Sequence, residues 1–134
     1  MNKKYLLDTN VCVFILQDKF NVANFVRKVG RKNCFVSEIT IAELMYGSAY
    51  SQSTKHAHDA DKISEMFKVL PIYDSLPTYA ETKAQLRRTG NLVDDFDLLI
   101  GASAVHNSLV MVTENVDHFS RIPGITIENW VERK

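Results

Sequence analysis

Short apolar runs that end in polar residues alternate along the chain with segments of helical periodicity. The runs predict strands, which lie at 4–7, 33–37, 69–73, 109–113 and 125–127. Apolar residues three and four positions apart predict helices over 10–17, 21–29, 38–50, 56–68, 78–89 and 96–105. Strands alternating with helices are typical of a parallel sheet covered on both faces, so the pattern predicts an α/β protein.

Three acidic residues stand out against apolar surroundings. Asp8 directly follows the first apolar run, and Asn10 could cap the helix that comes next. Glu43 lies on a mostly apolar helix, and Asp97 interrupts the start of another. Functional residues of an open α/β sheet lie just beyond the carboxyl ends of its strands, and a doubly wound fold could bring these acids to that edge.

Converging carboxylates would imply a particular chemistry. They repel one another and raise each other's pKa unless a cation lies among them. The chain has no clustered Cys or His, and hard oxygen ligands favour Mg²⁺ or Mn²⁺. Such a centre suits phosphodiester hydrolysis, because the metal neutralises phosphate charge and lowers the pKa of the attacking water.

Simpler structural explanations exist for the same residues. Asp8 could be only a helix cap, and Glu43 only a solvated acid on a helix surface. Asp94 and Asp95 are expected chiefly to complement the positive end of a helix dipole. Spacing alone therefore leaves both interpretations open.

Composition narrows the class of protein. The 134 residues suit one domain spanning 1–134, and 46% hydrophobic residues can build a core. The formal net charge of +0 gives no overall attraction to nucleic acid or membrane. Basic residues at 27–32 and 87–88 suit solvated faces but could bind a phosphate backbone locally.

The cysteines and the apolar runs indicate the compartment. Cys12 and Cys34 lie in apolar surroundings, as core cysteines do in a reducing compartment. No signal peptide is evident, and no apolar run approaches the ~20 residues of a membrane helix. We expect a soluble cytoplasmic protein with no membrane partner.

Several segments share a pattern that spans nearly the whole chain. They lie at 6–10 (LLDTN), 39–47 (ITIAELMYG), 97–104 (DLLIGASA), 112–115 (VTEN) and 119–130. In this order they resemble the motifs of the PIN-domain family, and most closely its VapC-type toxins of bacterial toxin–antitoxin pairs.

The resemblance implies a three-layer α/β/α sandwich with a central parallel sheet. It also implies a metal-dependent endoribonuclease that cleaves structured RNA, such as tRNA or rRNA, by metal-activated water. Asp8, Glu43 and Asp97 match the family's acids. Asp8 and Asp97 would bind Mg²⁺ or Mn²⁺ directly, and Glu43 would complete the site through a metal-bound water. Thr9 and Thr113 match small polar positions that support it.

The resemblance further implies three partners. These are an RNA substrate, a small VapB-type antitoxin that covers the site, and a second copy in a homodimer. Apolar residues of the early helices, namely Phe14, Phe20 and Phe25, are expected to be exposed for such contacts.

One position departs from the family pattern. Many PIN domains have a fourth acid just after the fourth strand, where this chain has Asn115. An asparagine carbonyl could still bind metal or water, and Asp117 could substitute if the loop turned it inward. The departure leaves the number of bound metals open.

Two other classes of protein remain possible on the residues alone. Asp8 could be the nucleophile of a haloacid-dehalogenase or receiver-type phosphoryl-transfer enzyme. The first type needs a second acid where Asn10 stands, and the second needs an acidic pair near the first strand. The other class is a non-catalytic PIN-like module that binds RNA or protein, in which replacing Asp8 or Asp97 would change no activity.

Overall fold

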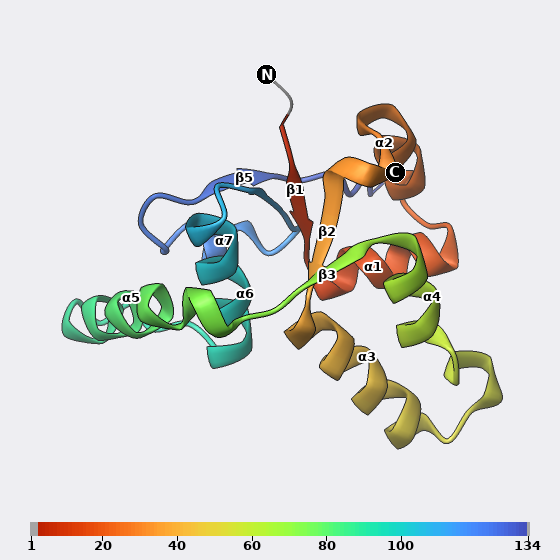
Figure 1. Ribbon diagram of the computed structural model, residues 1–134, viewed down its shortest axis with the longest axis horizontal. Helices are drawn as coiled ribbons and strands as arrows, with labels where there is room; N and C mark the ends of the chain where they lie inside the picture. The colour runs from red at the N-terminus through yellow and green to blue at the C-terminus, as the bar shows by residue number, and fades with distance from the viewer. Residues whose placement is uncertain (1–2, 134) are drawn as a thin grey trace.

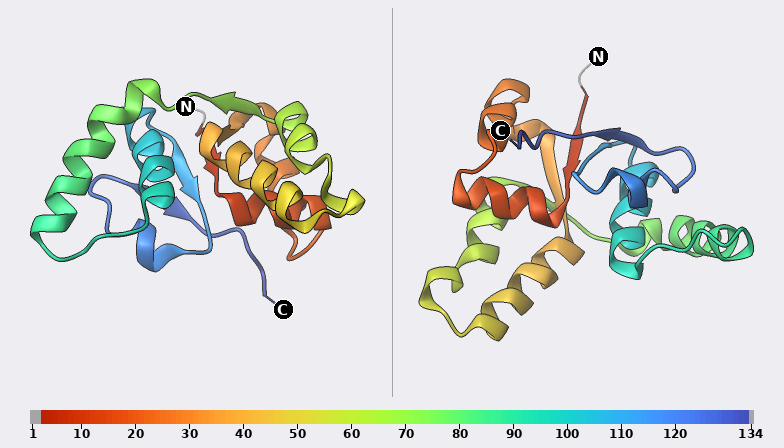
Figure 2. Two further views of the ribbon diagram at one scale, coloured as in Figure 1. Left: turned by 90° about the horizontal axis from the view of Figure 1, so that it is seen from below. Right: turned by 180° about the vertical axis from the view of Figure 1, so that it is seen from behind.

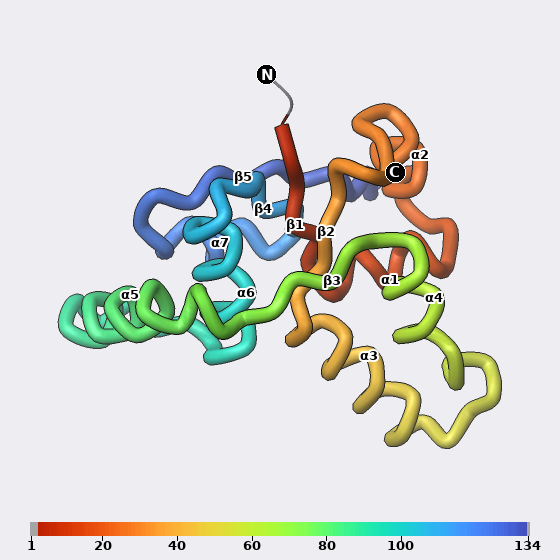
Figure 3. The backbone as a smooth tube through the Cα atoms, in the orientation of Figure 1, coloured from red at the N-terminus to blue at the C-terminus, as the bar shows by residue number. Residues whose placement is uncertain are grey.

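Five short parallel strands form the centre of the protein (Figure 1), whose computed structural model describes residues 3–133. The strands are β1 (Tyr5–Leu7), β2 (Cys34–Ser37), β3 (Lys68–Leu70), β4 (Val110–Val112) and β5 (Thr126–Glu128). Their order is β3-β2-β1-β4-β5, and every neighbouring pair is parallel. Figure 3 shows β4 beside β1, where the strand order reverses direction. This reversal creates a switch point at the carboxyl ends of β1 and β4.

Helices cover both faces of the sheet (Figures 1 and 2). The helices on one face are α1 (Thr9–Gln17), α2 (Val22–Val29), α3 (Glu38–Ser51) and α4 (Asp59–Met66). Those on the other face are α5 (Leu76–Arg88), α6 (Asp95–His106) and α7 (Val116–Phe119). Three single turns of 3₁₀ helix complete the chain, at η1 (Arg31–Asn33), η2 (Thr54–His56) and η3 (Tyr73–Ser75). The expected α/β/α sandwich with a parallel sheet is confirmed.

The apolar run at the start of the chain follows from this layering. Tyr5 and Leu7 pack into the core under α1–α4, whereas Leu6 packs into the core under α5–α7. Because a strand's side chains alternate between faces, a strand covered on both faces has no exposed position. All three residues are buried.

The third strand and two helices differ from the sequence prediction. β3 ends at Leu70, and not at 73, because Pro71 has no N–H to donate and the chain then turns into η3. β3 is an edge strand. The helix expected over 56–68 is divided into η2 and the shorter α4, and the four-residue α7 was not predicted.

The cysteines are core residues, as expected. Cys12 and Cys34 are buried free thiols. Burial raises the pKa of Cys34 to about 11 and raises that of Cys12 further, so both stay protonated. No helix among residues 3–133 is long and apolar enough to cross a membrane.

The prediction that the early phenylalanines are exposed is wrong. Phe14, Phe20 and Phe25 are partly buried and pack against the core. The Arg133 guanidinium lies 4.2 Å from the Phe20 ring centroid, and Phe25 stacks on Trp130 at 5.6 Å. Large apolar side chains are exposed elsewhere, at Met45, Tyr46, Tyr50, Tyr73, Leu92, Phe96 and Val116.

Candidate active site

Asp8 lies at the switch point, directly after β1. Its backbone N–H donates to Val112 O at 2.9 Å, which extends the pairing of β1 with β4 up to the site. Its Oδ1 accepts from the Thr9 N–H at 2.8 Å, and its Oδ2 accepts from Thr113 Oγ1 at 2.7 Å. Asp8 itself therefore caps α1, and the prediction that Asn10 caps it is wrong. With 7% of its surface exposed, the carboxylate is both a cap and a buried acid.

Glu43 is joined to Asp8 through Thr9. Thr9 Oγ1 donates to Glu43 Oε1 at 2.6 Å and lies 3.0 Å from Thr40 Oγ1. Because the Thr9 hydroxyl has one proton, which goes to Glu43, Thr40 is the donor in the second bond. The chain of hydroxyls fixes Glu43 on the second turn of α3, close to the end of β1.

Asp97 lies in the first turn of α6, beside the loop that follows β4. Asn115 Nδ2 lies 3.5 Å from Asp97 Oδ2 and 2.8 Å from His118 Nδ1. An amide nitrogen can only donate, so with this orientation of Asn115 the His118 Nδ1 is the acceptor. Asn115 thus turns its side-chain amide nitrogen toward Asp97. The backbone N–H of Asn115 donates to Thr113 Oγ1 at 2.9 Å.

The three acids act on one another electrostatically. Burial raises the pKa of Asp97 to about 6, and the charges of Asp8, Asp94 and Glu43 add to the rise. Burial also raises the pKa of Asp8, against the lowering effect of its Thr113 bond. The pKa of Glu43 is raised mainly by burial, with Asp8 and Asp94 contributing. The three acids therefore lie near enough to one another for their charges to interact.

Sequence reasoning missed two neighbours of these acids. Asp94 caps α6 through its bond from Phe96 N at 3.1 Å, as its position at a helix start suggested. It also raises the pKa of Glu43 and Asp97, and its spacing of one helical turn from Asp97 was the available signal. His118 was missed because the short helix α7, which brings it within one turn of Asn115, was not predicted.

Asp117, the other acid considered near this loop, is exposed on α7. Within the described part of the chain, its carboxylate forms no ion pair or hydrogen bond with the site residues. Of the two residues considered for the fourth acidic position, Asn115 is thus the one that contacts an acid of the site, at 3.5 Å from Asp97.

The donor chemistry fits a hard divalent cation. No ready-made group of three Asp, Glu, His or Cys ligands occurs among residues 3–133. Mg²⁺, however, keeps several of its waters and is usually bound through one or two carboxylates. Asp8 and Asp97 could supply these, with Glu43 acting through water. A cation between them would offset the burial that raises both pKa values and the repulsion that adds to the rise at Asp97.

The comparison with known proteins defines the class. The PIN-domain profile matches residues 5–125. This chain therefore belongs to the PIN-domain family, which excludes the haloacid-dehalogenase and receiver types of phosphoryl-transfer enzyme considered above.

Its relatives within the family are VapC proteins. Ribonuclease VapC2 of Rickettsia felis is 32% identical over 132 residues, or 94% of this chain and 97% of the relative. The tRNA(fMet)-specific endonuclease VapC of Salmonella typhimurium is 32% identical over 130 residues, covering 95% and 98%. The DNA-bound VapBC structure from Salmonella typhimurium superposes with a TM-score of 0.83 at 29% identity, covering 96% and 98%. The chain is thus a VapC-type PIN domain.

Proposed function

We propose that this protein is an endoribonuclease, the toxin of a toxin–antitoxin pair, that hydrolyses phosphodiester bonds in structured RNA such as tRNA or rRNA with Mg²⁺ or Mn²⁺. The relatives of this chain are named ribonucleases, one of them specific for tRNA(fMet). A non-catalytic PIN-like module is the alternative that the experiment below must exclude.

One observation carries this proposal. Within residues 3–133, no Lys or Arg side chain forms an ion pair with Asp8, Glu43 or Asp97. The basic side chain that does approach one of these acids is His118. Its Nδ1 lies 3.8 Å from Asp97 Oδ2 and accepts a hydrogen bond from Asn115. One buried and two half-buried carboxylates that no Lys or Arg pairs with indicate a site for an external cation.

Each site residue has a part that follows from its contacts. When bound, the divalent metal would neutralise phosphate charge and lower the pKa of the attacking water. Asp8 and Asp97 would hold it, and Thr113 keeps Asp8 in one orientation through its hydrogen bond. Thr9 orients Glu43, which would accept a hydrogen bond from water. Asn115 keeps its carbonyl oxygen as a further acceptor.

The proposal extends to the partners and the compartment. Two of the similar structures are VapBC complexes, so we propose a VapB-type antitoxin and a cytoplasmic site of action. A homodimer is supported by an uncharged face of α3 with exposed Ala42, Met45, Tyr46 and Ala49. These residues take the part first expected of the early phenylalanines.

The test is cleavage of total cellular RNA by purified protein freed of any co-purifying partner. Mg²⁺, Mn²⁺ and EDTA would be compared, with Asp8→Asn, Asp97→Asn and the control Asp95→Asn. Asp95 is exposed and ion-paired with Lys83 at 2.9 Å, outside the three-acid site. We expect discrete fragments that EDTA abolishes and that either site substitution reduces by more than about 100-fold.

Two outcomes would contradict the proposal. Folded, partner-free protein that cleaves nothing in either metal would favour the binding module. Cleavage that survives both site substitutions would mean that other residues carry the reaction.

A further inference from the structure

A groove leads away from Glu43, one of the three acids, between α1 and the segment η2–α4. Its inner part, of about 230 Å³, is lined by Thr9 and Glu43 at the site and by Val13, His56 and Asp59 farther out. The outer part, of about 390 Å³, is lined by the same Val13, His56 and Asp59 and continues to Lys19, Lys55 and Lys62. Val13, His56 and Asp59 line both hollows, so together the hollows lead from Thr9 and Glu43 to the lysines.

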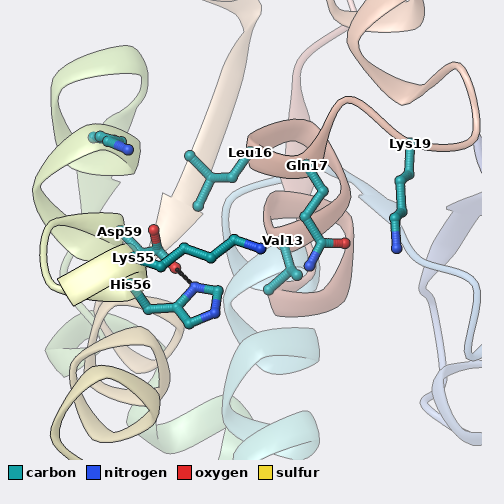
Figure 4. Close-up of a pocket in the computed structure, with 8 residues that line it drawn as sticks. Val13, Leu16, Gln17, Lys19, Lys55, His56 and Asp59 are labelled. Atoms are coloured by element: carbon teal, nitrogen blue, oxygen red, sulfur yellow. Dashed lines mark hydrogen bonds and ion pairs between the residues drawn. The ribbon is translucent and has the colours of Figure 1, made fainter. Parts of the chain in front are cut away.

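The outer part of the groove is basic. Lys19 lies just after α1, Lys55 in η2 and Lys62 in α4, and all three are exposed. None of them takes part in an ion pair with any residue between 3 and 133. Asp59, the acid that lines this part, is held by His56 Nδ1 at 3.1 Å. Figure 4 shows this pair and the Lys55 side chain reaching from η2 toward α1.

The negative charge of the three acids explains why unpaired lysines beside the site would help RNA to bind. An RNA strand that presents one phosphate to Asp8, Glu43 and Asp97 is repelled by their charges. The formal net charge of +0 supplies no overall attraction to compensate. Unpaired lysines beside the site can offset the repulsion by binding the phosphates that flank the reacting one, since lysine binds phosphate as a point charge.

We propose that this groove holds the substrate strand beside the scissile phosphate, with Lys55 and Lys62 binding backbone phosphates and Lys19 extending the same track. The proposal rests on the endoribonuclease function and names the path that the substrate takes from the site. Single-stranded nucleic acid is commonly bound in this way, through a positive groove that follows the backbone.

The test compares two double variants that remove equal charge. Lys55→Ala/Lys62→Ala removes the groove lysines, and Lys32→Ala/Lys68→Ala removes two exposed lysines of η1 and β3 that do not line the groove. Both are made in the Asp97→Asn background. Binding of a fluorescent single-stranded RNA oligonucleotide of mixed sequence is measured by anisotropy across a range of salt concentrations.

We expect the groove variant to bind more weakly and to lose about 1.4 from the slope of log K against log salt, or about 0.7 for each phosphate contact. The control variant should keep the parental slope. In the active protein, the groove substitutions should raise KM for RNA more than they lower kcat, because they remove binding that does not change in the transition state.

The outcomes separate this proposal from the function on which it rests. Equal slopes for the two variants, in a protein that cleaves RNA, would overturn the groove assignment alone. Unchanged RNA binding with lost affinity for poly-L-glutamate would assign the groove to an acidic peptide and also overturn it. A slope difference in a protein that cleaves nothing would support the groove and contradict the catalytic function.

Discussion

At the scale of single residues, Asp8 combines two tasks in one carboxylate. Its Oδ1 caps α1, and its Oδ2 accepts the Thr113 hydroxyl at 2.7 Å. The first bond stabilises the helix, whereas the second restricts how the carboxylate can face a ligand. The two tasks can be separated by mutation, because each uses a different oxygen.

Thr113→Val is the substitution that separates them. It conserves shape but removes the donor to Oδ2, so we expect affinity for Mn²⁺ and RNA cleavage to fall about 10- to 100-fold. The cap through Thr9 N remains, so α1 should stay intact. Isothermal titration with Mn²⁺ measures the affinity, and Thr113→Ser, which keeps the hydroxyl, is the control. Equal losses in both variants would show that the hydroxyl is not what matters.

Asp97 gives the metal-free protein a defined pH dependence. Its pKa is about 6 in the folded state, against an ordinary 3.8, chiefly because of burial and then the neighbouring acids. Between these values the folded protein binds more protons than the unfolded chain. The free energy of unfolding therefore falls as pH rises through this window.

The measurement is the melting temperature in EDTA from about pH 4 to about pH 6.5, a range set by that pKa shift. We expect a decline in the parent protein, a weaker one in Asp97→Asn, and recovery above pH 6 when Mg²⁺ is added. Parallel declines in parent and variant would assign the effect to other groups.

The acids themselves could be predicted from sequence, because each interrupts an apolar pattern at a motif position. Their hydrogen-bond partners were only partly predictable. Thr9 and Thr113 follow from the motifs, but the Thr40 hydroxyl and His118 depend on how α3 and the turn before α7 are oriented. Local spacing does not specify such orientations.

At the scale of elements, the close packing of α6 on α7 depends on Gly101. A Cβ at this position would clash with Ile122 Cδ1 and would lie 3.3 Å from Phe119 Cδ1. Gly47, in the middle of α3, would place a Cβ with no atom within 4 Å. Close packing therefore requires a glycine at 101, whereas the space around position 47 would accept a side chain.

Substitutions at these glycines should change stability in opposite directions. Gly101→Val overpacks the contact and should lower the free energy of unfolding by about 1–3 kcal/mol. Gly47→Ala should raise it by about 0.5–1 kcal/mol, since alanine favours the helix. Urea unfolding followed by circular dichroism measures both. A neutral Gly101→Val would mean that Ile122 and Phe119 can move aside.

The strands and long helices were predictable because their signals are local. Buried strands such as β1 appear as apolar runs, and α6 appears as a long apolar helix with an acidic start. The sequence predictions that were wrong concern residues whose structure depends on tertiary contacts as well as on local sequence. Pro71 ended β3 earlier than its apolar neighbours suggested, and four residues of α7 are too few for periodicity. Phe14 and Phe20 pack against the core and lie beside Arg133, which is far away in sequence.

At the scale of the whole molecule, the C-terminal segment packs between the sheet and α2, at the end of β1 opposite the three acids. Trp130 is 2% exposed, and its ring centroid lies 5.1 Å from that of Tyr5 in β1 and 5.6 Å from that of Phe25 in α2. Its Nε1 donates to Glu128 Oε1 at 2.9 Å. Tyr5 begins the strand that Asp8 follows, so this aromatic packing and the proposed site lie at opposite ends of β1.

Trp130→Ala tests this separation. The substitution opens a cavity between β1, α2 and the C-terminal segment, and we expect the free energy of unfolding to fall by about 3–5 kcal/mol. Trp130→Phe keeps a ring against Tyr5 and Phe25 and should cost less. Urea unfolding gives the stability, and RNA cleavage is normalised to the folded fraction. Because Trp130 touches none of the acids, the normalised rate should match that of the parent. A variant that stays fully folded but loses cleavage would show instead that the two ends of β1 are coupled through the strand.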